Sequence, residues 1–197
     1  MAQTHDHEMV SIYPFTDEQR DALLNGSNEC VLMWATKDGW PVGVTHAFTW
    51  DGEKIWLTFA VHRHRYTAMT RDPRVSVNVS SAGNPTGAAP HGAITIKGKA
   101  EFFEDEETKH WFYTELSNKL NPGSEEGSKF FYDLLNSPLR TVCCITPEKY
   151  IMYNADTAGA HMAGQAKEED LGKPMDVDVE RMNAERRKRG LDERYEV

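Results

Sequence analysis

Between residues 29 and 103 the chain is a succession of short strand-forming segments joined by tight turns. Lys37-Asp38-Gly39 separates the first two segments and Asp51-Gly52 the next two, and the Asp-Gly pair is typical of hairpins. Strands joined in this way pair in antiparallel order, because a hairpin reverses the direction of the chain. The expected strands cover residues 29–36, 41–50, 53–60, 74–80, 93–103 and 140–153.

Helical segments accompany these strands. Thr16 followed by Gln19 has the form of a capping box, which predicts a helix that runs to about Leu24. Further helices are expected over residues 66–71, 105–120 and 125–135. Several short strands, with two helices between the fifth and the last strand, predict a mainly β fold. We expect a small antiparallel barrel with peripheral helices.

The two ends of the chain are polar, which divides its 197 residues into one domain and two tails. We expect an N-terminal tail over residues 1–15, one domain over 16–155, and a charged C-terminal tail over 156–197 that is a mobile arm or a peripheral helix. His5-Asp6-His7-Glu8 has residue types that bind metals, but it lies at a chain end. We therefore expect no metal site there.

The net charge of -9 argues against a nucleic-acid binder or an anionic-membrane binder, because both need a broad basic face. No apolar run approaches the roughly 20 residues that cross a bilayer. The first nine residues lack the apolar core of a signal peptide, so the cytoplasm is the expected location. Cys143 and Cys144 are adjacent in a strand and point to opposite faces, and with Cys30 they are expected to be buried free thiols.

A basic island interrupts this acidic chain directly after the strand expected at residues 53–60. It reads His62-Arg63-His64-Arg65 and is followed by Arg71-Asp72-Pro73-Arg74-Val75. Neighbouring cations repel one another unless an anion lies among them, and guanidinium groups hold phosphate through several charge-assisted hydrogen bonds. The island therefore indicates a site for a phosphorylated small molecule, and the alternative is a solvated start of a helix.

The order of these features resembles the pyridoxamine 5'-phosphate oxidase-like superfamily of FMN-binding split β-barrels, which also contains deazaflavin-dependent reductases. The resemblance covers roughly residues 18–153 and is strongest over residues 55–79. It is carried by the Asp-Gly turns, Trp56-Leu57-Thr58-Phe59-Ala60, the Arg-x-Arg step, Arg71-Asp72-Pro73-Arg74-Val75 and Gly98-Lys99-Ala100. It implies a split β-barrel that forms a homodimer, with the cofactors in the interface.

The resemblance also implies which residues contact FMN. By position, Arg65 matches the family's phosphate-binding basic residue, with Arg63 and His64 beside it. The remaining expected contacts, along the flavin ring and the ribityl chain, are Thr45, His46, Ala47, Phe48, Leu57, Thr58, Phe59 and His91. For His46, a histidine satisfied within the core is an equally good interpretation.

The function that the resemblance implies is an FMN-dependent oxidoreductase that acts on a small organic substrate, with no catalytic residue assigned. Residues 149–156 contain no arginine, whereas true pyridoxamine phosphate oxidases grip the substrate phosphate with one in this region. Pyridoxamine phosphate is therefore not the expected substrate. A deazaflavin-dependent reductase is one alternative. A non-enzymatic flavin- or haem-binding carrier or sensor is another, with His46 or His91 as an iron ligand.

Overall fold

The computed structural model describes residues 8–82 and 90–194. Parts of the expected N-terminal tail and of the loop over residues 81–92 lie outside the described residues, as do His5, Asp6 and His7. The strands are β1 (Glu29–Ala35), β2 (Pro41–Ala47), β3 (Thr49–Trp50), β4 (Ile55–Ala60), β5 (Arg74–Ser80), β6 (Gly92–Phe103) and β7 (Arg140–Asn154). The helices are η1 (Val10–Ile12), α1 (Asp17–Gly26), α2 (His64–Arg71), α3 (Glu106–Leu120), α4 (Glu125–Leu135), α5 (Ala155–Met162), η2 (Glu168–Asp170) and α6 (Asp176–Lys188).

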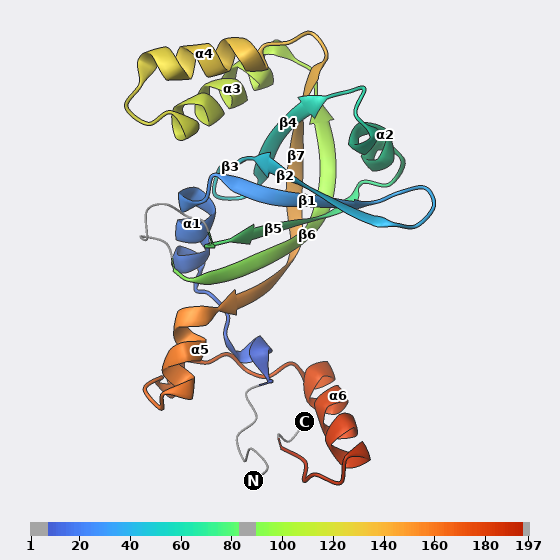
Figure 1. The fold of residues 1–197 in the computed structure, drawn as a ribbon, viewed down its shortest axis with the longest axis vertical. Coiled ribbons are helices and arrows are strands. Elements are labelled where there is room, and N and C mark those ends of the chain that lie inside the picture. The colour runs from blue at the N-terminus through green and yellow to red at the C-terminus, as the bar shows by residue number, and fades with distance from the viewer. Residues whose placement is uncertain (1–7, 83–89, 195–197) are drawn as a thin grey trace.

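The strands form one antiparallel sheet in the order β2-β1-β5-β6-β7-β4-β3, which confirms the expected mainly β class. The expectation of one strand over residues 41–50 is wrong, because the chain breaks its pairing at Phe48. Phe48 is fully buried, and it carries the chain from β2 at one edge of the sheet to β3 at the other. A single residue can join the two edges only if the sheet curls, so this break shapes the half-barrel seen in Figure 1.

The longest pairing in the sheet joins β6 to β7, and it contains one irregularity, between Lys97 and Gly98, opposite Lys149 and Pro147. Pro147 supplies no N–H for the ladder, which is consistent with a bulge at this point. Gly98 is needed there because a Cβ on it would lie 2.5 Å from the Thr146 carbonyl oxygen. In Figure 1 β7 runs the length of the sheet, from the end near α3 and α4 to the start of α5.

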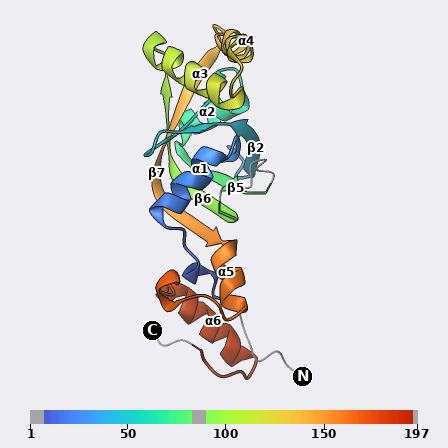
Figure 2. The same ribbon diagram turned by 90° about the vertical axis from the view of Figure 1, so that its left-hand side faces the viewer.

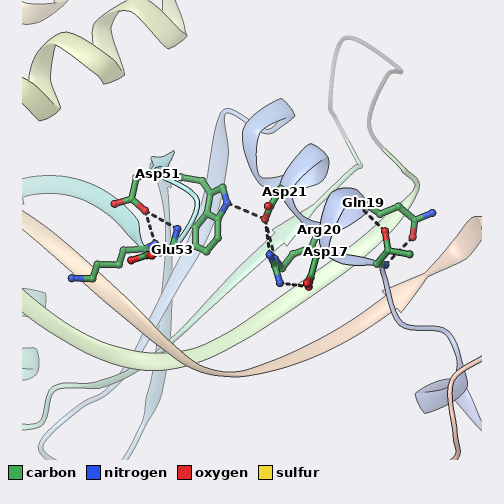
Figure 3. A network of polar contacts seen from close by, with 9 residues as sticks. Asp17, Gln19, Arg20, Asp21, Asp51 and Glu53 are labelled. Carbon is green, nitrogen blue, oxygen red and sulfur yellow. Dashed lines mark hydrogen bonds and ion pairs between the residues drawn. The ribbon is translucent and has the colours of Figure 1, made fainter.

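Helix α1 closes one side of the barrel core. The expected capping box is present, since the Thr16 hydroxyl accepts from the Gln19 N–H and the Gln19 side chain accepts from the Thr16 N–H. At the other end of this helix, Leu23 and Leu24 are fully buried in the core. Figure 3 shows the polar network on the solvent side, where the Trp50 indole N–H donates to Asp21 at 3.2 Å.

Helices α3 and α4 pack together over the outer face of β4 and β7, where Phe112, Tyr113 and Val142 are buried. Lys119, near the end of α3, donates to the Phe48 carbonyl oxygen at 3.1 Å. Its ammonium group lies 4.3 Å from the centroid of the Phe48 ring. The α3–α4 pair is therefore tied to the point where the chain crosses between the sheet edges.

The two ends of the chain meet at the opposite end of the sheet from α3 and α4 (Figures 1 and 2). Met9, Ile12 and Tyr13 form a small buried cluster with Ala158 of α5 and Val179 of α6. The Asn154 N–H donates to the Tyr13 carbonyl oxygen at 2.9 Å, which joins this cluster to the end of β7. Residues 155–188 are thus mostly helical and packed against the N-terminal segment.

The three cysteines are buried free thiols, as expected. Burial raises the pKa of Cys30 and of Cys144 to about 12 and that of Cys143 further, so all three are uncharged at neutral pH. None of the helices in the described part of the chain is long and apolar enough to cross a membrane.

Candidate functional site

The basic island lies where β4 ends and α2 begins. Arg63 is the N-cap of α2 and makes no side-chain capping hydrogen bond, and the first turn of the helix contains no acidic residue. The N-terminus of a helix attracts anions and disfavours cations, so Arg63 and Arg65 at this end are unfavourably placed without a negative partner. This arrangement favours the binding of an anion from outside the chain.

Arg65 is half-buried between two aromatic rings. Its guanidinium carbon lies 5.7 Å from the Trp34 ring centroid and 5.4 Å from that of Phe59. The Arg65 Nε is buried and has no hydrogen-bond partner within the described residues. Burial, with Arg63 adding to it, lowers the pKa of the guanidinium group. Arginine remains protonated even so, and no carboxylate among the described residues pairs with Arg65 to neutralise its charge.

Arg140 joins this group, although no local sequence pattern singles it out. It begins β7 directly opposite Ala60, the last residue of β4, and it is half-buried. Burial lowers the pKa of Arg140, and the nearby Arg63 lowers it further. Within residues 8–82 and 90–194, no carboxylate forms an ion pair with Arg63, Arg65 or Arg140. Only the pairing of β4 with β7 makes this residue part of the site.

His46 faces the same group from β2. Its ring centroid lies 5.8 Å from that of Phe59, and its Nε2 is buried with no hydrogen-bond partner in the described part of the chain. Burial, with Arg65 and Arg140 adding to it, lowers the pKa of His46 to about 4. His46 is therefore a neutral imidazole at physiological pH.

The other expected contacts fall into three places. Phe48, Leu57 and Phe59 lie in the barrel core, and the Thr58 hydroxyl donates to the Thr141 carbonyl oxygen at 2.8 Å beneath α3. Ala47 packs at the edge of the cluster under α3 and α4, while Thr45 is exposed on the opposite face of β2 from His46. His64 is exposed, and its ring centroid lies 6.4 Å from that of Trp34.

His91 lies apart from these residues. It directly precedes Gly92, which pairs with Asn154 at the far end of β7 from Arg140. Its ring Nδ1 contacts Asp156 at 2.8 Å, and its backbone N–H donates to the same carboxylate. Within one chain, His91 is therefore not part of the arginine group.

A groove of about 420 Å³ begins beside the arginine group. Trp34 belongs to its lining, which continues over Met33, Pro41, Ser76 and Lys97. Lys97 is exposed and forms no ion pair with the part of the chain that the structure describes. The rest of the lining is mostly apolar, which suits a planar ring system, and it also contains Arg74 and Glu148, so the groove has charges of both signs.

This donor set fits a phosphate group and does not fit a metal ion. Three guanidinium groups that have no carboxylate partner in residues 8–82 and 90–194 supply donors and charge for a dianion, and the buried Arg65 Nε finds no acceptor in these residues. Among the described residues, no three His, Cys, Asp or Glu side chains come together in a way that could hold a metal. The site therefore suits a phosphorylated organic molecule.

The curled antiparallel sheet with its helices is a split β-barrel, and the arginine group lies where its strands β4 and β7 pair next to α2. The chain belongs to the pyridoxamine 5'-phosphate oxidase family, whose model matches residues 15–154. The match ends with β7, so α5 and α6 lie beyond it. A search of curated proteins finds no match to this chain.

Solved structures share the fold at low sequence identity. A conserved hypothetical protein of Mycobacterium tuberculosis is 20% identical over 73% of this chain and 87% of its own, with a TM-score of 0.61. An F420 reductase is 21% identical over 66% of this chain and 94% of its own, with a TM-score of 0.51. A haem-storage protein of Vibrio cholerae is 13% identical over 64% of this chain and 86% of its own, with a TM-score of 0.50.

Proposed function

We propose that this protein binds FMN and works as a flavin-dependent oxidoreductase on a small organic substrate. The observation that carries the proposal is the group of Arg63, Arg65 and Arg140, which no carboxylate of the described chain neutralises. A phosphate that bears nearly two charges neutralises such a group. Membership of the pyridoxamine 5'-phosphate oxidase family supports FMN as the molecule that brings it.

In this proposal the protein binds and orients the cofactor, and bound FMN supplies the hydride chemistry. Arg65 holds the phosphate, with Arg63, His64 and Arg140 around it. Thr45, His46 and Ala47 lie toward the ring and ribityl chain. The buried side chains of Phe48, Leu57, Thr58 and Phe59 support them from the interior. His91 lies apart from the arginine group, so it would contact a flavin held by a partner subunit. Because residues 149–156 contain no arginine, we propose a substrate other than pyridoxamine phosphate.

We also propose that the protein is a homodimer, paired through the sheet face that turns away from the core. On this face Val31 pairs with Thr45 and Asn78, and Thr95 pairs with Ile151. On the same face of β7, Ile151 is 49% exposed and Tyr153 is 37% exposed, so two large side chains are in contact with solvent there. A partner subunit would cover them. Light scattering on the purified chain tests this proposal, and a monomer at micromolar concentration would contradict it.

A deazaflavin-dependent reductase is the second candidate. The groove lined by Trp34 also contains Lys97, which forms no ion pair among the described residues and suits a cofactor with a longer anionic tail than FMN carries. The structural likeness to an F420 reductase supports the same possibility. Titration of the cofactor-free chain with FMN and with F420 in parallel separates the two, because the true cofactor binds with the lower Kd.

The first experiment is the visible spectrum of the purified protein, with mass analysis of what denaturation releases. We expect FMN in the wild type and its loss in Arg65→Ala. Truncating one partner of a desolvated charge pair costs about 2–4 kcal/mol, which weakens binding by about 30- to 900-fold. A Soret band would instead support a haem carrier. A colourless chain that takes up neither flavin would refute the oxidoreductase.

A further inference from the structure

The interior side of the arginine group contains three buried polar atoms that have no hydrogen-bond partner among the described residues. They are the Trp34 Nε1, the His46 Nε2 and the Arg65 Nε. The three side chains form a continuous series, because Arg65 lies against both Trp34 and Phe59 and the Phe59 ring lies against His46. Buried unpaired polar atoms are uncommon, and three in one series indicate a missing acceptor.

The charges that face His46 are all positive. Arg65 approaches from α2 and Arg140 from β7, and both oppose protonation of the imidazole. From β1, Cys30 is the cross-strand partner of His46, and its buried thiol is uncharged, while Trp34 and Phe59 are neutral. No carboxylate therefore offsets the two arginines within the described residues around His46.

We propose that His46 belongs to the anion site and takes up a proton from solvent when a dianionic group binds beside Arg65 and Arg140. This inference rests on the proposed phosphate site. Binding of the dianion offsets the repulsion from Arg65 and Arg140, which adds to burial in keeping the imidazole neutral, and the imidazolium then adds a further positive charge to the site. Anion binding and protonation of His46 are thermodynamically linked. The bound anion raises the proton affinity of His46 by some factor, and protonation of His46 raises the affinity for the anion by the same factor.

Sulfate is the best probe of this linkage, because it stays dianionic over the whole working range whereas the FMN phosphate itself titrates near pH 6. Without sulfate, His46 should titrate at about 4. If sulfate binding raises the pKa of His46 from about 4 to about 6, sulfate should bind about tenfold more tightly at pH 5 than at pH 8. The neutral variant His46→Gln should bind sulfate with a Kd that hardly changes over this range.

The experiment follows the NMR signal of a His46 ring proton in the full chain as the pH is changed, with and without saturating sulfate. The signal is assigned by its loss in His46→Gln. The matched control is His110→Gln, because His110 contacts Tyr132 on the exposed side of α3 and should leave the linkage intact. An unshifted His46 titration in a chain that binds sulfate overturns this inference alone. A wild-type chain that binds no sulfate overturns the anion site and this inference together.

Discussion

The guanidinium carbon of Arg65 lies 5.7 Å from the centroid of the Trp34 ring, and Trp34 is 6% exposed. A rigid, buried ring therefore supports the charge that the proposed phosphate site needs. A cation that lies over an indole face is stabilised without being neutralised, because the ring carries a quadrupole and no net charge. Arg65 is thus held in place while its charge stays available to a ligand.

Trp34→Leu tests this support. Losing the cation–π contact should weaken FMN binding by about 1–2 kcal/mol, or roughly 5- to 30-fold in Kd. Trp34→Phe keeps an aromatic face and should recover most of the affinity. Flavin fluorescence quenching measures the Kd at a temperature where both variants are folded. Trp40→Leu is the control, because Trp40 is 70% exposed. Equal affinities of the Leu and Phe variants would contradict the role of the ring.

Lys119 should make stability depend on pH in the alkaline range. Burial lowers its pKa from 10.5 to about 8, so between these values the unfolded chain binds the proton more readily than the folded one. The free energy of unfolding should therefore rise with pH over this window, by about 1–3 kcal/mol relative to Lys119→Met. Urea unfolding of both proteins at pH 8 and pH 10.5 measures the difference. Parallel pH profiles would show that Lys119 does not titrate in this way.

Gly98→Ala should destabilise the barrel at the irregularity between β6 and β7. The added Cβ would lie 2.5 Å from the Thr146 carbonyl oxygen, and a backbone atom cannot move aside cheaply. We expect a loss of about 2–4 kcal/mol in the free energy of unfolding.

Gly159→Ala is the matched control for this prediction, because Gly159 lies in α5 and nothing is within 4 Å of a Cβ there. It should stabilise the protein by about 0.5–1 kcal/mol through helix propensity. Thermal unfolding compares the two variants. A Gly98→Ala protein as stable as the wild type would mean that the two strands can shift at this point.

Local signals predicted most of the secondary structure, because they depend on residues close in sequence. The capping box at Thr16 and the strand that begins at Arg74 are both confirmed. The break at Phe48 was not predicted, since the alternation of residues 41–50 is unbroken and only closure of the barrel interrupts it. Arg140 was missed for the same reason, because strand pairing alone brings it to Arg65 and Arg63.

The packing of the chain ends depends on pairs that are still more distant in sequence. The hydroxyl of Tyr13 contacts the His161 Nδ1 at 2.8 Å across 148 positions. Neither residue carries a local signal for this contact, and the polar composition of residues 156–197 conceals the few apolar side chains that are buried. Composition therefore indicated an arm or a peripheral helix but not which surface it packs against.

Asn154 should control whether α5 and α6 stay docked. Its side-chain oxygen accepts from the N–H groups of Asp156 and Thr157, and its amide nitrogen donates to Gln19 at 3.2 Å. Asn154→Ala removes both the cap and this link to α1, and because Asn154 is 1% exposed we expect a loss of about 2 kcal/mol.

Asn154→Asp separates the two roles of this side chain, because a carboxylate keeps the cap but cannot donate to Gln19. It should recover about 1 kcal/mol of the loss, the usual contribution of an N-cap. Hydrogen exchange followed peptide by peptide locates the effect. Faster exchange in Asn154→Ala should be confined to residues 155–188 and the N-terminal segment, because the barrel core does not contain Asn154. Faster exchange throughout β5 and β6 would instead show that the docked ends support the whole barrel.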